Sequence, residues 1–168
     1  MKKLLLFLII SIYLFGSVSF DNVSSSFIQT ITNDQNRTII YKGDLLVADD
    51  EILWNYKEPI KKSVLIKSSQ VIITEPELFQ VTVIRQEEGI NLKKIYQKSK
   101  EIAPNVRGVK YNETVMKLLI GKSFLKKITF QDELENQVVI EFRDTIHKPI
   151  PKSLFDVSIP VDYDVIYR

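Results

Sequence analysis

The sequence predicts a mainly β protein with a small α component, folded as a long antiparallel meander. Apolar and polar residues alternate through most of residues 38–83 and again through residues 115–143, which is the pattern of strands that bury one face. Pro59 and Pro76 fall between these runs, where a residue without an amide proton does no harm. Only two segments place apolar residues at helical spacing, so helices are the minor component.

Residues 1–19 have the layout of a secretory signal peptide. Lys2 and Lys3 precede an apolar run, and Ser17 and Ser19 supply a small-x-small cleavage site. The run is shorter than the roughly 20 apolar residues of a membrane-spanning helix, and an uncleaved anchor is the alternative. Residues 20–168 contain no low-complexity segment and no long linker, so we expect them to form a single domain.

Charge and composition exclude several functional classes. The formal net charge of the chain is +2. Removal of Lys2 and Lys3 with the signal peptide leaves a neutral protein, which lacks the excess positive charge typical of proteins that bind nucleic acid. Cysteine is absent, which excludes thiol chemistry, thiolate metal sites and a lipid anchor on cysteine. We expect no cofactor and no bound metal.

The first segment of the mature chain predicts a short helix. Residues 21–32 place Phe27, Ile28 and Ile31 on one side at helical spacing, with Asp21 or Asn22 available as the N-cap. These three apolar residues form one stripe on an otherwise polar segment. We therefore expect them to pack against the sheet as a lid.

The remaining elements follow in order. Residues 90–104 carry lysines around an apolar stripe and predict a second helix that ends at Pro104. A turn is predicted at residues 132–136. Alternation predicts strands at residues 38–47, 52–56, 63–67, 71–73, 79–83, 115–120, 124–130 and 137–143, with shorter strands at 153–160 and 162–166.

The balance of these elements leaves apolar surface without a cover. About nine strands each offer one apolar face, and two short helices are the only elements available to bury it. A sheet of this size can fold into a sandwich, close into a barrel or curve around the helices. In the last case the unfilled space is an apolar pocket suited to a lipid-like ligand. A sandwich whose core is filled by its own side chains remains the alternative.

The candidate pocket residues share the apolar parity of neighbouring strands, and Trp54, the only tryptophan, lies among them. They are Ile39, Tyr41, Leu45, Ile52, Trp54, Tyr56, Val64, Ile66, Phe79, Val81, Phe130, Ile140 and Phe142.

No catalytic constellation is visible in the sequence. His147 is the only histidine and lies beside prolines in a predicted surface loop, which makes a poor metal site. The Gly-Lys-Ser run at residues 121–123 lacks the upstream glycine loop of a phosphate cradle, and the acidic run at 132–135 lacks the spacing of a calcium loop. The sequence therefore favours a binding protein over an enzyme.

Several short motifs, taken together, resemble the periplasmic outer-membrane lipoprotein carriers, the LolA family. Trp54-x-Tyr56 ends at Pro59, and Glu75-Pro76-x-Leu78-x-Gln80 follows. A segment from Phe155 to Pro160 and then Asp164-Val165-Ile166 close the chain in the same order as in the family. The resemblance extends over residues 27–166.

The resemblance implies an incomplete, half-open antiparallel β-barrel with a short helical lid. Its concave face would be a lipid-binding cavity for the acyl chains of lipoproteins, with Phe27, Ile28 and Ile31 on the lid. The implied partners are acylated lipoproteins, an inner-membrane lipoprotein-releasing ABC transporter, and an outer-membrane acceptor or the outer membrane itself. The implied location is the periplasm, and we expect a monomer.

One departure concerns the lid. Relatives carry an arginine after the Gly-x-Leu segment that tethers the lid, whereas this chain has Ala48, Asp49 and Asp50 there. The lid of this chain would therefore depend on apolar packing. Two alternatives to a carrier remain: a lipoprotein- or lipid-sensing regulator of envelope stress, and a bridge-like β protein for lipopolysaccharide.

Overall fold

The computed structural model describes residues 18–85 and 91–168 of the chain. The predicted signal peptide therefore lies outside the described residues, apart from Val18 and Ser19. The strands are β1 (Val23–Thr32), β2 (Thr38–Ala48), β3 (Glu51–Glu58), β4 (Lys62–Ile66), β5 (Gln70–Glu75), β6 (Gln80–Arg85), β7 (Lys100–Ala103), β8 (Val106–Tyr111), β9 (Thr114–Ile120), β10 (Leu125–Gln131), β11 (Gln137–His147) and β12 (Asp164–Tyr167). The helical elements of these residues are η1 (Pro76–Leu78), α1 (Leu92–Lys98) and η2 (Lys152–Phe155).

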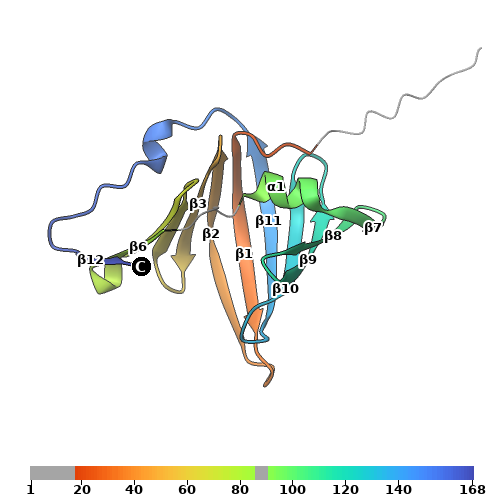
Figure 1. Ribbon diagram of the computed structural model, residues 1–168, viewed down its shortest axis with the longest axis horizontal. Coiled ribbons are helices and arrows are strands. Elements are labelled where there is room, and N and C mark those ends of the chain that lie inside the picture. The colour runs from red at the N-terminus through yellow and green to blue at the C-terminus, as the bar shows by residue number, and fades with distance from the viewer. Residues whose placement is uncertain (1–17, 86–90) are drawn as a thin grey trace, which may run out of the picture.

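These strands form one sheet in the order β12-β6-β5-β4-β3-β2-β1-β11-β10-β9-β8-β7. Neighbouring strands are antiparallel except β12 and β6, which run parallel. The edges β12 and β7 lie at opposite ends of the order, so the sheet stays open (Figure 1). The predicted fold class, a mainly β protein with an incomplete antiparallel barrel, is confirmed.

The helix α1 crosses one face of the sheet at one end of the strands, and the turns of hairpins β1–β2 and β10–β11 lie at the other end (Figure 1). We call the face that carries α1 the inner face and the opposite one the outer face. Because paired residues of neighbouring strands share a face, the register assigns each side chain. In the part of the chain that the structure describes, no helix is long and apolar enough to span a membrane.

Two apolar clusters lie on the two faces. The inner cluster extends from β4 across the sheet to β8 and includes Phe27, Leu45, Ile52, Leu118 and Phe142, with Leu92 and Ile95 from α1 above them. The outer cluster is smaller and lies over β3 to β6. Its buried members are Ala48, Leu65, Ile72, Val81, Ile150 and Phe155, and the last two belong to the segment after β11 that crosses this face.

The predicted first helix is wrong, because residues 23–32 form strand β1 in the middle of the sheet. Its backbone pairs with β2 on one side and β11 on the other. Val23, Ser25 and Phe27 alternate as buried residues, and the Ser25 hydroxyl lies 2.8 Å from the Arg143 carbonyl, to which it donates. A spacing of four residues, as between Phe27 and Ile31, fits a strand as well as a helix, which explains the error.

The second helix is shorter than predicted. It ends at Lys98, and Ser99 is extended, with φ −75° and ψ 152°. Residues 100–103 then form β7, which pairs with β8, a strand that the sequence did not predict. The Ser99 hydroxyl donates to the Tyr96 carbonyl over 2.6 Å, so a side chain closes the last helical turn well before Pro104.

The predicted strand at residues 153–160 is also wrong. The 3-10 turn η2 occupies Lys152–Phe155, and residues 156–163 after it form no strand. The strand predicted at 162–166 is present as β12, which pairs with β6. The strands predicted between residues 38 and 83 and between 115 and 143 are all present, with small changes at their ends.

Candidate functional site

The register places most of the predicted pocket residues together on the inner face. They are Ile39, Tyr41, Leu45, Ile52, Trp54, Tyr56, Val64, Ile66, Phe130, Ile140 and Phe142. Their exposure varies from Leu45, which is fully buried, to Ile39, of which 52% is exposed. The inner face thus combines a sealed core with apolar surface that is still accessible.

Two predicted pocket residues lie elsewhere, and this part of the prediction is wrong. Register pairs Ile73 with Thr82 and places Val81 opposite Thr74, so Val81 belongs to the outer cluster. Phe79 follows η1 in a left-handed conformation, is 56% exposed, and packs its ring on Tyr163 at 5.7 Å between centroids. Alternation shows which residues of one strand share a face, but it does not fix the register with the next strand.

The three predicted lid residues belong to β1 and form no helical lid. Phe27 and Ile31 lie on the inner face, where Phe27 is buried. Ile28 points to the outer face, opposite Lys42 and Glu141. Phe27 and Ile31 are therefore part of the floor of the site, and the cover has to come from α1.

An aromatic row crosses the inner face. Neighbouring rings meet edge-on or tilted, which is the arrangement that aromatic quadrupoles favour. The centroid distances are 5.8 Å for Tyr41–Tyr56, 5.0 Å for Tyr56–Phe27, 5.0 Å for Phe27–Trp54, 6.0 Å for Trp54–Phe142, 5.3 Å for Phe142–Phe124, 5.4 Å for Phe124–Phe20 and 5.3 Å for Phe20–Tyr96.

Gly43 makes the centre of this row possible. It pairs with Phe27 on β1 and with Tyr56 on β3. A Cβ at this position would lie 2.1 Å from the Asn55 carbonyl oxygen and 2.8 Å from Cε1 of Phe27. Because glycine has no side chain, the Phe27 ring lies over its backbone and reaches Tyr56 on the next strand but one.

Cations stand at both ends of the aromatic row. Lys62 Nζ is 4.7 Å from the Tyr56 ring centroid, and the guanidinium carbon of Arg107 is 4.8 Å from that of Tyr96. The Tyr56 hydroxyl donates to Gln29 Oε1 over 2.9 Å. Burial raises the pKa of Tyr56 to about 12, and Tyr41 nearby adds to the rise, so this phenol is neutral at physiological pH.

Arg107 also holds the C-terminal end of α1. Its Nε donates to the Ser99 hydroxyl over 2.7 Å, and its Nη2 donates to the Ser99 carbonyl over 2.6 Å. Arg107 lies on β8 and pairs with Leu118, so it projects from the inner face. A forked donor set of this kind fixes an acceptor pair more precisely than a single ammonium does.

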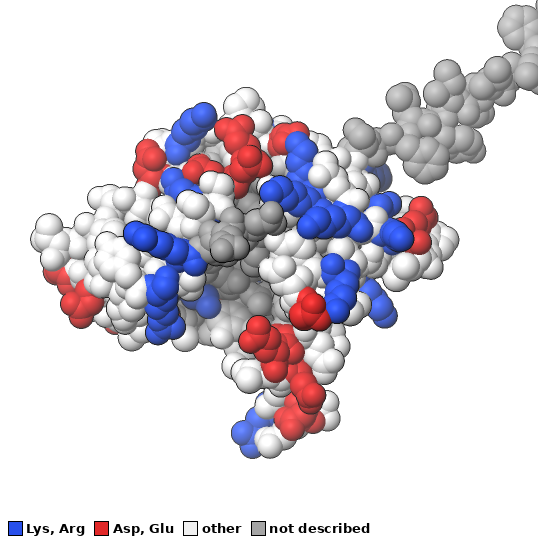
Figure 2. Space-filling model, viewed as in Figure 1, with Lys and Arg blue, Asp and Glu red and all other residues white. Residues whose placement is uncertain are grey.

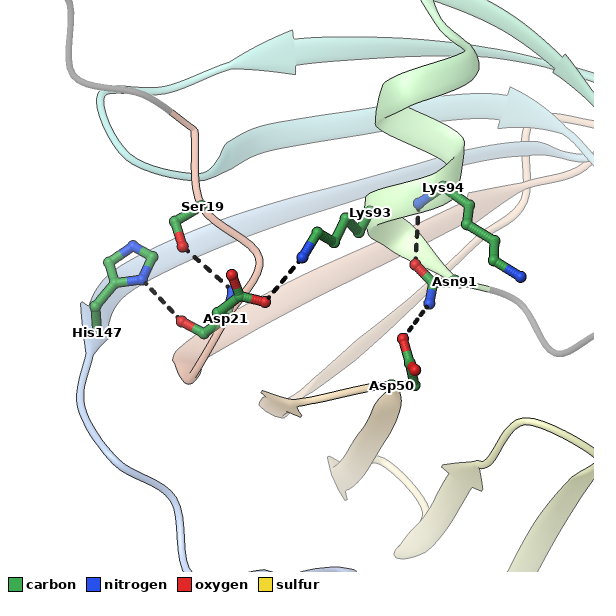
Figure 3. A network of polar contacts seen from close by, with 7 residues as sticks. All are labelled: Ser19, Asp21, Asp50, Asn91, Lys93, Lys94 and His147. Carbon is green, nitrogen blue, oxygen red and sulfur yellow. Dashed lines mark hydrogen bonds and ion pairs between the residues drawn. The ribbon is translucent and has the colours of Figure 1, made fainter.

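A polar network holds the N-terminal end of α1 (Figure 3). Asn91 caps the helix by accepting from the Lys94 amide over 2.9 Å, and its Nδ2 donates to Asp50 Oδ1 over 3.1 Å. Lys93 Nζ lies 3.3 Å from Asp21 Oδ1. Asp50 belongs to residues 48–50, where the resemblance implied an arginine, and here it supplies a hydrogen-bond acceptor to the helix.

At the end away from α1 the inner face is less covered. One row of paired residues runs across six strands, from β2 to β8: Ile39, Ile31, Val138, Phe130, Met116 and Val109. Ile31, Phe130 and Met116 are half-buried, and Ile39 is exposed. With about 4.8 Å between strands, the row is about 24 Å long, which makes a continuous apolar track.

The described residues, 18–85 and 91–168, hold no group of candidate metal ligands with three or more His, Asp or Glu side chains. His147 lies at the edge of the α1 network, with Nδ1 3.4 Å from the Asp21 carbonyl oxygen (Figure 3). The arrangement is suited to binding an apolar ligand.

Sequence reasoning missed several inner-face residues, among them Phe20, Tyr96 and Phe124, which complete the aromatic row. It also missed Arg107. The stretch Val106–Tyr111 alternates, and Arg107 shares the parity of Val109 and Tyr111. A charge among residues of apolar parity is the signal that could have identified it.

Comparison with known proteins gives related sequences and folds. The outer-membrane lipoprotein carrier protein of Campylobacter jejuni is 31% identical over 167 residues, which are 98% of each chain. That of Wolinella succinogenes is 31% identical over 138 residues, 79% of this chain and 78% of the other. That of Helicobacter pylori strain J99 is 29% identical over 84% of this chain and 77% of its own. No family model matches the sequence.

Solved structures share the fold at low sequence identity. A LolA superfamily protein from Nitrosomonas europaea has a TM-score of 0.56 and 10% identity, with 84% of this chain and 92% of that chain covered. An uncharacterized conserved protein from Thermus thermophilus has a TM-score of 0.55 and 9% identity, with 88% and 91% covered. The sequence relationship over nearly the full length, together with the open barrel, shows that the chain belongs to the outer-membrane lipoprotein carrier family, LolA.

Proposed function

We propose that the protein is a periplasmic carrier that binds the acyl chains of lipoproteins on its inner face. The proposal depends on one observation above all: the apolar row from Ile39 to Val109 extends beyond α1, and Ile31, Phe130 and Met116 in it are only half-buried. Three of the related proteins are named outer-membrane lipoprotein carrier proteins. The predicted signal peptide at residues 1–19 supports export.

In this scheme the carrier takes its cargo from an inner-membrane lipoprotein-releasing ABC transporter. It shields the acyl chains in the aqueous periplasm and delivers them to an outer-membrane acceptor or to the outer membrane itself. It acts as a monomer and performs no covalent chemistry. Both edge strands, β7 and β12, are four residues long, which disfavours end-to-end stacking as a lipopolysaccharide bridge.

Release is as important as binding for a carrier. Each buried methylene contributes about 0.8 kcal/mol, so full enclosure of several acyl chains would exceed any affinity that a carrier could reverse. The short helix α1 covers only part of the inner face. We propose that cargo displaces α1 from the aromatic row, and that the lost contacts of Leu92, Ile95 and Tyr96 offset part of the binding free energy.

The experiment has two parts. Mass spectrometry of the protein purified from periplasm should identify co-purifying acylated lipoproteins, and calorimetry should show that a triacylated peptide binds while the same peptide without acyl chains does not. Lipopolysaccharide as the principal co-purifying species would support the bridge instead. Absence of binding by the triacylated peptide would reject the carrier proposal.

A further inference from the structure

A groove opens on the inner face between the turns of hairpins β8–β9 and β10–β11. Its volume is about 490 Å³, and its lining includes Tyr111, Met116, Phe130 and Leu134. Tyr111, Met116 and Phe130 point to the inner face. Met116 pairs with both Val109, an inner-cluster residue, and Phe130, and Tyr111 lies two residues after Val109 on the same strand. The groove therefore lies beside the β8–β9 and β10–β11 turns, and at its edge Lys98, the last residue of α1, places Nζ 5.7 Å from the centroid of the Tyr111 ring.

The groove is continuous with the apolar row of the candidate site. Met116 and Phe130 belong both to the groove and to the row that crosses from Ile39 to Val109. A ligand with acyl chains on that row and a hydrophilic remainder has to leave the inner face where the row is uncovered. The groove between the two hairpin turns is such an exit.

The turn at residues 132–136 gives one wall of the groove a fixed shape. The Asp132 carboxylate accepts from the amides of Leu134 and Asn136, each over 2.9 Å, and from Asn136 Nδ2 over 3.0 Å. The Asn136 side chain and these amides hold the pKa of Asp132 below its usual value, so it remains ionised. Leu134 is 81% exposed at the tip of this turn, where its side chain can contact a ligand.

The rim of the groove is acidic. Asp132 and Glu133 line it, and Glu113 and Glu135 lie on the opposite side of the same two turns. Glu113 is paired with Lys110 at 2.6 Å, whereas no Lys or Arg among the described residues forms an ion pair with Glu133 or Glu135. Acidic side chains collect at this lower end of the molecule (Figure 2).

We propose that this groove receives the polypeptide segment that follows the acylated residue of the cargo, and that it selects basic segments over acidic ones. The inference rests on the proposed function, since it names a cargo class for the same inner face. A lysine or arginine has an apolar stem and a cationic head, which match the apolar floor and the acidic rim. Complementary charge at a solvated rim contributes more to selection than to total affinity.

The test uses four peptides and the full chain. Two triacylated peptides differ only in carrying two lysines or two glutamates after the acylated cysteine, and the other two are their unacylated forms. The triacylated lysine peptide should bind about three- to tenfold more tightly than the glutamate peptide at low salt, because exposed ion pairs contribute modestly. High salt should shrink this ratio.

Variants locate the effect. The double substitution Glu133→Gln and Glu135→Gln should reduce the preference for the triacylated lysine peptide, and Asp132, which also lines the rim, is retained because it holds the turn. Glu77→Gln, an exposed acidic residue in η1 at a different place in the fold, is the matched control and should keep the preference.

The outcomes separate this inference from the proposed function. Equal affinity of the two triacylated peptides for the unmodified protein would overturn the inference and leave the carrier proposal intact, as would an unchanged preference in the double variant. Binding of the unacylated lysine peptide as tightly as its acylated form would overturn both the inference and the carrier proposal, and would assign the groove to a basic partner protein. Failure of both triacylated peptides to bind would overturn the carrier proposal itself.

Discussion

The two faces of the sheet are built from the same alternating strands but are covered differently. On the outer face, the segment after β11 lays Ile150 and Phe155 over Leu65, Ile72 and Val81, and all five are buried. On the inner face, α1 and Phe20 cover one end of the sheet, while several residues at the other end remain half-buried or exposed.

This difference shows which apolar surface serves stability and which can serve binding. The outer cover is the segment between β11 and β12, which includes η2, and both of these strands are hydrogen-bonded into the sheet. The inner cover is a seven-residue helix that packs Leu92 and Ile95 on the sheet and is held by polar contacts at its two ends. A cover this short exposes few apolar residues when it opens, whereas exposure of the outer cluster would detach the whole segment between two strands.

The largest expected effect is loss of stability on the outer face. Phe155→Ala should lower the free energy of unfolding by about 3–5 kcal/mol, because it removes a fully buried aromatic ring, while the folded protein should bind a triacylated peptide with unchanged affinity. Urea unfolding and calorimetry measure the two quantities. Leu154→Ala, at a neighbouring residue that is 50% exposed, is the control and should cost less than about 0.5 kcal/mol. A weakened affinity in folded Phe155→Ala would contradict the separation of the two faces.

The next effect is loss of binding on the inner face. Trp54→Ala should weaken the affinity for a triacylated peptide about ten- to a hundredfold, since it removes a large half-buried contact surface worth about 1.5–3 kcal/mol. Leu53→Ala changes the adjacent residue on the same strand, which faces the outer cluster, and should leave affinity unchanged. Equal losses from the two substitutions would show that binding depends on the strand and not on its inner side.

Gly43→Ala tests the centre of the aromatic row. The added methyl group meets the Asn55 carbonyl and the Phe27 ring, so we expect a loss of about 1–3 kcal/mol in stability and a changed fluorescence emission from Trp54, which touches Phe27. Gly108→Ala is the control, because its Cβ would lie 3.3 Å from the end of the exposed Ile102 side chain. A fully tolerated Gly43→Ala would show that the strands can separate here without cost.

Arg107→Lys tests the restraint on α1. Lysine cannot donate to the Ser99 hydroxyl and carbonyl with the same fork, so hydrogen exchange of the α1 amides should rise about tenfold, a change of about 1.4 kcal/mol. Lys110→Gln is the control, because Lys110 lies on the same strand and pairs with Glu113 on the surface. If exchange in α1 is unchanged in Arg107→Lys, apolar packing alone holds the helix.

The smallest effect is a pH dependence of stability. The folded-state pKa of Tyr56 is about 12, above its ordinary value of 10.0. The neutral Tyr56 phenol therefore contributes fully to the free energy of unfolding below pH 10, and this contribution is lost as pH rises toward 12. Tyr56→Phe should therefore lose less stability than the unmodified protein between about pH 9 and about pH 11, as measured by urea unfolding. Tyr167→Phe, at a site that is 71% exposed, should behave like the unmodified protein. If the stability of Tyr56→Phe declined with pH as steeply as that of the unmodified protein, the Tyr56 phenol would ionise as freely in the folded protein as in the unfolded chain.

The sequence alone determined the strand content and much of the inner face. Alternation identified β2 to β6 and β9 to β11, because period two in side-chain polarity is a local property of an extended chain. The same parity placed Trp54, Tyr56 and Ile140 on one face. It also showed that two short helices could not cover so much apolar sheet, and only one α-helix is present among the described residues.

Only the tertiary structure decided how the strands are aligned and what covers them. The spacing of Phe27 and Ile31 fits both helix and strand, and pairing with β2 and β11 chose the strand. Val81 was misplaced because register depends on hydrogen bonds between strands, and a shift by one residue exchanges the two faces. The contact between Arg107 and Ser99, and the cover that Phe155 provides, join residues of different elements, and no local pattern encodes such contacts.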